Sequence, residues 1–245
     1  MAGGFRGPGH LPNLRGGEPA AAERLPRQRR GTTPQMHGRY PDYDVLEQAA
    51  HWDAATREVV LARVNDVPTV RFFSPAEAHC LRAFCDAAMA QARDPRIPVL
   101  EMVDAKLFEG RLDGFRYDDM PDDRDVWRLV ARGLDETARE RGCEDFAATG
   151  DEAREAIVSD FAQAKLSGGA WDELNVKRAF SVVMRGVVQA FYSHPWAWNE
   201  IGFGGPAYPR GYVRLATGQR ESWEGAAAKE AEVDAVKEVD AQGLP

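Results

Sequence analysis

Residues 191–212 read Phe191-Tyr-Ser-His-Pro-Trp-Ala-Trp-Asn-Glu-Ile-Gly-Phe-Gly-Gly-Pro-Ala-Tyr-Pro-Arg-Gly-Tyr212, with seven aromatic residues, three prolines and four glycines. Proline removes a backbone donor and fixes φ, and glycine adopts backbone angles that other residues avoid. The whole stretch therefore cannot be one regular helix or strand. A flexible linker would be rich in glycine and serine and poor in aromatics. We expect an irregular loop whose large apolar side chains are buried in the protein's own core or on a partner.

The chain before this segment has the apolar spacing of amphipathic helices. Two of the expected helices begin with a capping box, at Ser74-Pro-Ala-Glu77 and at Thr149-Gly-Asp-Glu152. A strand over 58–64 is the alternative for the first helix, because that run contains several β-branched residues. No convincing pairs of alternating strands occur, so the sequence predicts an all-α domain of five to six helices. The expected helices cover about 53–67, 74–92, 98–110, 122–142, 149–161 and 176–194.

Composition divides the chain into three parts. Residues 1–44 are rich in glycine, proline and arginine and lack a periodic apolar pattern, so we expect a disordered arm or one draped on a partner. Residues 45–220 form the predicted helical domain. Residues 221–245 are acidic and rich in alanine, and are predicted to be a disordered tail or a frayed, solvated helix.

Charge and hydropathy exclude two classes of function. The net charge of −8 does not provide the basic footprint that nucleic-acid binding needs. No apolar run is long enough to predict a transmembrane helix. Arg29-Arg30 is a twin arginine, but no apolar stretch follows it, so no signal peptide is expected in this chain.

Three cysteines, Cys80, Cys85 and Cys143, are too few for a disulfide scaffold. We expect them to be small, buried apolar residues with free thiols. Pairing of one of them with another chain stays open as the alternative.

The candidate motifs for chemistry each favour a structural role. Gly202-Phe-Gly-Gly-Pro206 follows a predicted helix, whereas a dinucleotide-binding loop follows a strand. The acidic run over 118–125 lacks the ligand spacing of a calcium loop and suits the start of a helix. His194 is the most plausible catalytic residue, but no nucleophile or orienting carboxylate accompanies it in a recognisable motif. We therefore predict no catalytic, cofactor-binding or metal-binding residues, with capping or interface packing as the role of His194.

Residues 192–212 closely resemble the terminal motif of the gluconate 2-dehydrogenase subunit 3 family. Further matches to this family occur upstream in the expected order, so the resemblance covers about residues 40–223. They are Trp52-Asp-Ala-Ala-Thr56, Val60-Leu-Ala-Arg63, Arg71-Phe-Phe-Ser-Pro-Ala-Glu77, Arg96-Ile-Pro-Val99, Asp113-Gly-Phe-Arg-Tyr-Asp-Asp-Met-Pro121 and Gly133-Leu-Asp135.

The resemblance implies a non-catalytic small subunit that binds, stabilises and assists the maturation of a large dehydrogenase. That partner is a flavoprotein of the glucose–methanol–choline (GMC) type, which carries FAD and oxidises alcohols or sugar acids such as gluconate. A cytochrome subunit often accepts its electrons. Many relatives carry a twin-arginine signal, and this chain departs from them after Arg29-Arg30. We expect a cytoplasmic protein, or a periplasmic one if a signal-bearing partner exports it.

The aromatic segment is also the expected partner-binding site, because Trp, Tyr and Arg dominate the energetics of interfaces. Whether its aromatics pack inward or face the partner stays open. Two alternatives to the accessory subunit are a standalone helical binding module and an independent enzyme that uses His194. The predicted partner-binding residues are His194, Trp196, Trp198, Phe203, Pro206, Tyr208, Arg210 and Tyr212.

Overall fold

A computed structural model describes residues 40, 43–91, 94–112, 114–213 and 220–226. These residues form seven α-helices and two short 3-10 helices, and no strand occurs among them, which confirms the all-α class. The α-helices are α1 (Ala54–Asn65), α2 (Pro75–Ala88), α3 (Val99–Phe108), α4 (Asp123–Glu140), α5 (Asp151–Ala162), α6 (Val176–Ser193) and α7 (Pro195–Ile201). The 3-10 helices are η4 (Val45–His51) and η5 (Gly169–Glu173).

Six of the seven α-helices correspond to the predicted ranges. Residues 58–64 lie in α1, so the helix and not the alternative strand is correct, and Asp53 caps it by accepting a hydrogen bond from Thr56 N at 3.0 Å. The capping box that starts α2 is present, with the Ser74 and Glu77 side chains each bonded to the other's backbone. The helix count is higher than predicted because α7, η4 and η5 are too short to show a clear apolar period.

The second predicted capping box is wrong. Thr149 is 1% exposed, and its hydroxyl donates to the carbonyl of Asp145 at 2.9 Å, within the turn before α5. Gly150 occupies the N-cap position of α5 and makes no side-chain cap. The hydroxyl of Thr149 is thus used by the preceding turn and does not bond the first turn of the helix.

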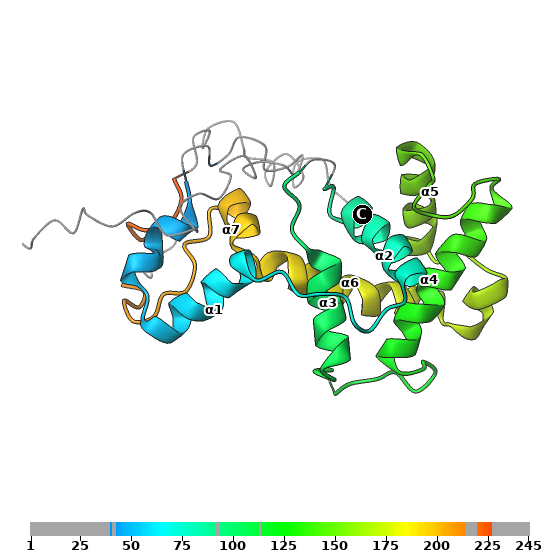
Figure 1. The fold of residues 1–245 in the computed structure, drawn as a ribbon, viewed down its shortest axis with the longest axis horizontal. Helices are drawn as coiled ribbons and strands as arrows, with labels where there is room; N and C mark the ends of the chain where they lie inside the picture. Colours follow the sequence, from blue (N-terminus) through cyan, green and yellow to red (C-terminus); the bar gives the residue numbers. More distant parts are fainter. Residues whose placement is uncertain (1–39, 41–42, 92–93, 113, 214–219, 227–245) are drawn as a thin grey trace, which may run out of the picture.

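The main lobe consists of α2 to α6 with η5, packed around one apolar core (Figure 1). Its largest fully buried side chains include Phe84, Phe146, Phe161, Trp171 and Phe191. Burial of each such side chain contributes about 1.5–3 kcal/mol relative to exposure. These residues come from α2, α5, α6, the α4–α5 loop and η5, and apolar residues of α3 and α4 complete the same core.

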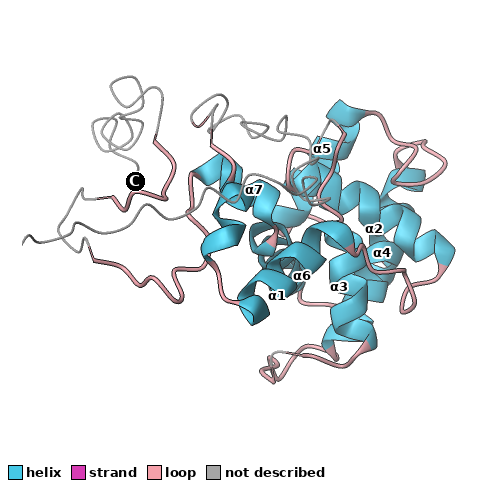
Figure 2. Ribbon diagram, turned by 60° about the vertical axis from the view of Figure 1, so that its left-hand side comes forward, coloured by secondary structure: helices cyan, strands magenta, loops and turns pink. Residues whose placement is uncertain are grey.

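A small lobe lies beside it, made of η4, α1 and α7 with residues 202–213 and 220–226. It has its own apolar cluster of Val45, Leu46, Trp52, Val60, Val64 and Trp198. Figure 2 shows that loops make up much of this end of the molecule, whereas helices dominate the main lobe. The long helix α6 belongs to the main core and leads directly into α7, and Trp196 contacts both clusters. The aromatic segment therefore lies at the junction of the two lobes.

The described termini pack onto the small lobe. The Tyr43 hydroxyl donates to the carbonyl oxygens of Phe203 at 3.2 Å and Trp223 at 3.0 Å. Gly225 N donates to the carbonyl of Gly202 at 3.1 Å. The boundaries expected at 44 and 220 thus fall inside a packed unit, which includes residues 43–44 and 220–226. Apart from Tyr40, the rest of the predicted arm and tail lies outside the described residues.

Candidate partner-binding site

The aromatic segment, residues 191–212, is partly helical. Its residues 195–201 form α7, which corrects the expectation of an irregular loop throughout. Pro195 is at the first position of α7, where a missing N–H costs nothing, and Gly202 ends the helix in the left-handed region with φ 69°. A proline start followed by a glycine stop seven residues later was the sequence signal for this helix.

His194 is a structural cap. It is 1% exposed, and its Nδ1 accepts a hydrogen bond from Trp196 N at 3.2 Å, which satisfies a donor at the start of α7. Its ring also contacts the Trp196 ring edge-on, with centroids 4.9 Å apart. A general base must reach its substrate, and this imidazole is packed on all sides. The structure therefore supports the capping role and removes the basis for an enzyme that uses His194.

Trp198 anchors the segment in the small lobe. It is 5% exposed, and its indole Nε1 donates to the carbonyl of Tyr192 at 2.7 Å. The Phe203 ring meets it edge-on at 5.5 Å, and the Arg63 guanidinium lies 5.9 Å from the Trp198 ring. Trp198 is thus a core residue with a satisfied donor, and it supports the exposed aromatics beside it.

Three of the predicted residues remain at the surface. Phe203 is 39% exposed, Tyr208 66% and Tyr212 45%, and they are joined by Val213 at 79%. These four large side chains are exposed and lie within eleven positions of one another in the sequence. We call Phe203, Tyr208, Tyr212 and Val213 the aromatic surface.

The backbone beneath the aromatic surface is braced by long-range contacts. The Arg210 guanidinium donates to Gln48 Oε1 at 3.0 Å and lies 4.2 Å from the Trp223 ring. Burial is the main factor that raises the pKa of the Tyr43 hydroxyl, so this donor stays protonated to a more alkaline pH than an exposed tyrosine. Pro206 and Trp196 are partly buried. Such bracing fixes the exposed aromatics before any partner binds.

Asn199 is a structural residue that sequence reasoning did not identify. It is 3% exposed, and its Oδ1 accepts from Val45 N at 2.7 Å, which ties η4 to α7. Its amide nitrogen lies 3.4 Å from Asp44 Oδ1. Asn199 lies in the short helix α7, and no local pattern reveals its pairing because the partner is more than 150 residues away in the chain.

A sequence model described as gluconate 2-dehydrogenase subunit 3 matches residues 75–205, more than half of the chain. The chain belongs to the gluconate 2-dehydrogenase subunit 3 family. The matched range covers the main lobe, α7 and the first part of the aromatic segment. No curated protein and no solved structure matches the chain.

The subunit 3 name suggests a component of a dehydrogenase complex.

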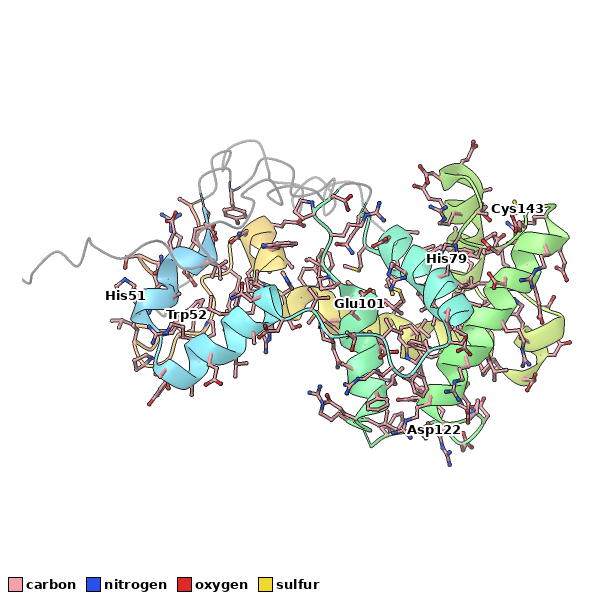
Figure 3. The ribbon with its side chains drawn as sticks, in the orientation of Figure 1. His51, Trp52, His79, Glu101, Asp122 and Cys143 are labelled. Atoms are coloured by element: carbon pink, nitrogen blue, oxygen red, sulfur yellow. The ribbon has the colours of Figure 1, made fainter. Side chains whose placement is uncertain are left out.

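The described residues contain no group of three or more His, Cys, Asp or Glu side chains that could hold a metal ion. The acidic run over 118–125 serves the fold instead. Asp122 caps the start of α4 by accepting from Arg124 N at 3.0 Å (Figure 3). Asp119 pairs with Arg178 and accepts from the Asn175 amide at 3.0 Å. No helix in the described part of this subunit 3 chain is long and apolar enough to cross a membrane.

The three cysteines of the subunit 3 chain are free thiols. Cys80 and Cys85 are fully buried on α2, as predicted, and burial raises the pKa of both thiols. Cys143 is only partly buried, just after α4, at the end of the molecule opposite the small lobe (Figure 3). Cys143 is therefore the one of the three that reagents in solvent can reach.

Proposed function

We propose that this chain is the non-catalytic small subunit of an FAD-dependent dehydrogenase of the GMC type. It binds the large subunit, stabilises it and assists its maturation. The large subunit holds the FAD and oxidises an alcohol or a sugar acid such as gluconate, and a cytochrome subunit accepts the electrons. The observation that carries the proposal is membership of the subunit 3 family together with an exposed aromatic surface on a braced backbone.

The aromatic surface has the composition of an interface centre. Tyrosine and phenylalanine offer large contact areas and have few rotatable bonds, so little entropy is lost when they dock. Tyr208, the most exposed aromatic of the segment, is the expected anchor. Arg210 lies partly buried beside it and adds a cation that is already fixed by Gln48 and Trp223.

Burial separates the predicted partner-binding residues into two groups. Phe203, Tyr208 and Tyr212 are exposed enough to make direct contact with the large subunit. His194 and Trp198 are buried, so we assign them to the support of that surface. Trp196, Pro206 and Arg210 are partly buried and lie between the two groups.

Co-expression with a candidate large flavoprotein subunit of the GMC type tests the proposal. The expected result is a co-purifying complex and a large subunit with more bound FAD and higher soluble yield than when expressed alone. A large subunit that is equally soluble, FAD-loaded and active without this chain would refute the proposal. A standalone helical binding module, the first of the two alternatives, predicts a monomer with no large exposed apolar patch.

A further inference from the structure

Two buried N–H groups of Arg210 have no acceptor among the described residues. They are Nε and Nη2, and Nε1 of Trp223 is likewise buried without a hydrogen-bond partner there. The Arg210 guanidinium lies over the Trp223 ring, 4.2 Å from its centroid, so the three donors belong to one stacked pair. Buried donors in proteins are nearly always bonded, and three together call for an acceptor that the described residues do not supply.

The two donors of Arg210 form one edge of its guanidinium. The third nitrogen, Nη1, donates to Gln48 Oε1 at 3.0 Å, which orients the group. Nε–H and Nη2–H are parallel and match the oxygen atoms of a carboxylate. Arg82 shows this edge filled, because its Nε and Nη2 both donate to Glu101 Oε1, at 3.0 and 2.7 Å. Arg210 presents the same edge and has only a neutral amide at its other nitrogen.

Two carboxylates near Arg210 are bonded to other groups. Burial is the main factor that raises the pKa of Tyr43. Asp44 and Glu224 raise this pKa further, whereas Arg210 lowers it, so the three charges lie around one hydroxyl. Asp44 accepts from a backbone N–H of η4 at 3.1 Å, and Glu224 accepts from Glu221 N at 2.8 Å. The ion pairs among the described residues do not include Arg210, so no direct contact there balances its charge.

The surroundings of Arg210 favour a ligand with a single negative charge. One guanidinium balances one carboxylate, and the nearby Asp44 and Glu224 repel a dianion such as a phosphate. A water molecule would accept the hydrogen bonds, but it has no charge to offset that of a buried cation. A carboxylate supplies both the acceptor atoms and the charge.

We propose that the Nε–Nη2 edge of Arg210 binds a carboxylate, which accepts both N–H groups and balances the charge of the guanidinium. Arg210 is partly buried between two exposed neighbours, Pro209 and Gly211, so rotation of exposed side chains gives access to this edge. The carboxylate comes from an aspartate or glutamate of the large subunit that covers the aromatic surface, or from a small acid in solution. The first source rests on the proposed function, and the second does not.

Proton–nitrogen NMR of the arginine Nε–H groups tests the site in the full chain. The Arg210 signal is identified by its loss in Arg210→Lys. Sodium acetate is added to the free chain in one arm, and the large subunit is added in the other. A carboxylate on the edge moves the Nε–H proton signal downfield, because a charge-assisted hydrogen bond is strong. We expect this shift in at least one arm, which identifies the source, and no shift with sodium chloride at the same ionic strength.

Arg210→Lys also tests the energetics, because lysine keeps the charge but lacks the fork. It is expected to weaken binding of the ligand identified by NMR by about tenfold or more. The indole Nε1–H signal of Trp223 follows acetate, and a binding titration follows the large subunit. Arg82→Lys is the matched control, because Arg82 is already paired with Glu101 in the main lobe, and it should leave binding unchanged. Urea denaturation of each free variant shows whether it is folded.

The site and the proposed function fail in different ways. No shift of the Arg210 signal in either arm, or a shift that sodium chloride reproduces, overturns the carboxylate site. If the complex still forms in that case, the proposed function stands. If the unmodified chain forms no complex, the proposed function fails and the acetate arm alone decides the site.

Discussion

Gly133 illustrates how a single residue position is constrained by a distant one. A Cβ at this position of α4 would lie 2.6 Å from Cε2 of Trp171 in η5, closer than side chains approach one another. The glycine thus permits the close packing of α4 against η5. The family resemblance included Gly133-Leu-Asp135, but the sequence offered no physical reason for the glycine because Trp171 is far along the chain.

We predict that Gly133→Ala lowers the free energy of unfolding by about 1–3 kcal/mol, the cost of overpacking a core, even though alanine is the better helix former. Urea denaturation measures the change. Gly150→Ala is the control, because its Cβ would meet no atom within 4 Å, and it should cost less. Equal stability of Gly133→Ala and the unmodified chain would show that the Trp171 contact is not tight.

The cysteines provide a second prediction at this scale. A thiol-specific reagent should modify Cys143 in the native protein within minutes, because Cys143 is only partly buried. Cys80 and Cys85 should react only after unfolding, because burial raises the pKa of both thiols and blocks access. Mass spectrometry of labelled peptides checks this order. Rapid native labelling of Cys85 would contradict the packing of α2.

Helix starts show what local sequence can and cannot predict. The capping box at Ser74 was predicted correctly, since every atom that forms it lies within four residues. The one at Thr149 was wrong, because that side chain is buried and bonded to the preceding turn. The same four-residue pattern therefore gives a cap only where the side chain faces the helix.

At the scale of elements, Asp104 joins α3 to the segment that leads into α2. It is fully buried, and its carboxylate accepts from the backbone N–H groups of Arg71 at 2.7 Å, Phe72 at 2.9 Å and Phe73 at 2.9 Å. The Asp104 side chain thus satisfies three backbone N–H groups that have no partner within a helix. Sequence reasoning found α3 but not this link, because an aspartate in a helix usually faces solvent.

We expect Asp104→Asn to destabilise the protein by about 2–3 kcal/mol, because the amide replaces one acceptor oxygen with a donor group and leaves buried N–H groups unsatisfied. The free energy of unfolding in urea reports the loss. Asp135→Asn is a comparison at a less buried acceptor, which receives one backbone hydrogen bond from Phe146 N at 3.0 Å. A similar loss in both variants would argue against a special role for Asp104.

At the scale of the whole molecule, the sequence predicted one domain core, and the structure has two apolar clusters joined by α6, α7 and Trp196. The small lobe combines residues 43–65 with residues 195–213 and 220–226. Its contacts connect residues up to 180 positions apart, as between Tyr43 and Trp223. Helical periodicity carries no information about such pairs, so the sequence did not predict the contacts that residues 43–44 and 220–226 make with the lobe.

Within the small lobe, burial distinguishes a residue expected to support stability from one proposed to bind the partner. Trp198→Ala should cost about 3–5 kcal/mol of unfolding free energy, because it removes a buried aromatic from the small cluster. Tyr208→Ala should change stability by less than about 0.5 kcal/mol, since this side chain is 66% exposed, and should weaken assembly with the large subunit at least tenfold. Thermal unfolding and a binding titration measure the two effects. A clear loss of stability in Tyr208→Ala would show that this side chain contributes to the core and not to an interface.

We propose that this subunit 3 chain docks onto a flavoprotein and does no redox chemistry itself. The most direct measurement is size-exclusion chromatography with light scattering on the separately purified large subunit, this chain and their mixture, with FAD absorbance and dehydrogenase activity recorded across the peaks. We predict one complex of defined stoichiometry, in which the FAD and the activity belong to the large subunit and this chain alone has neither. Two separate peaks in the mixture, or dehydrogenase activity in the peak of this chain alone, would contradict the account.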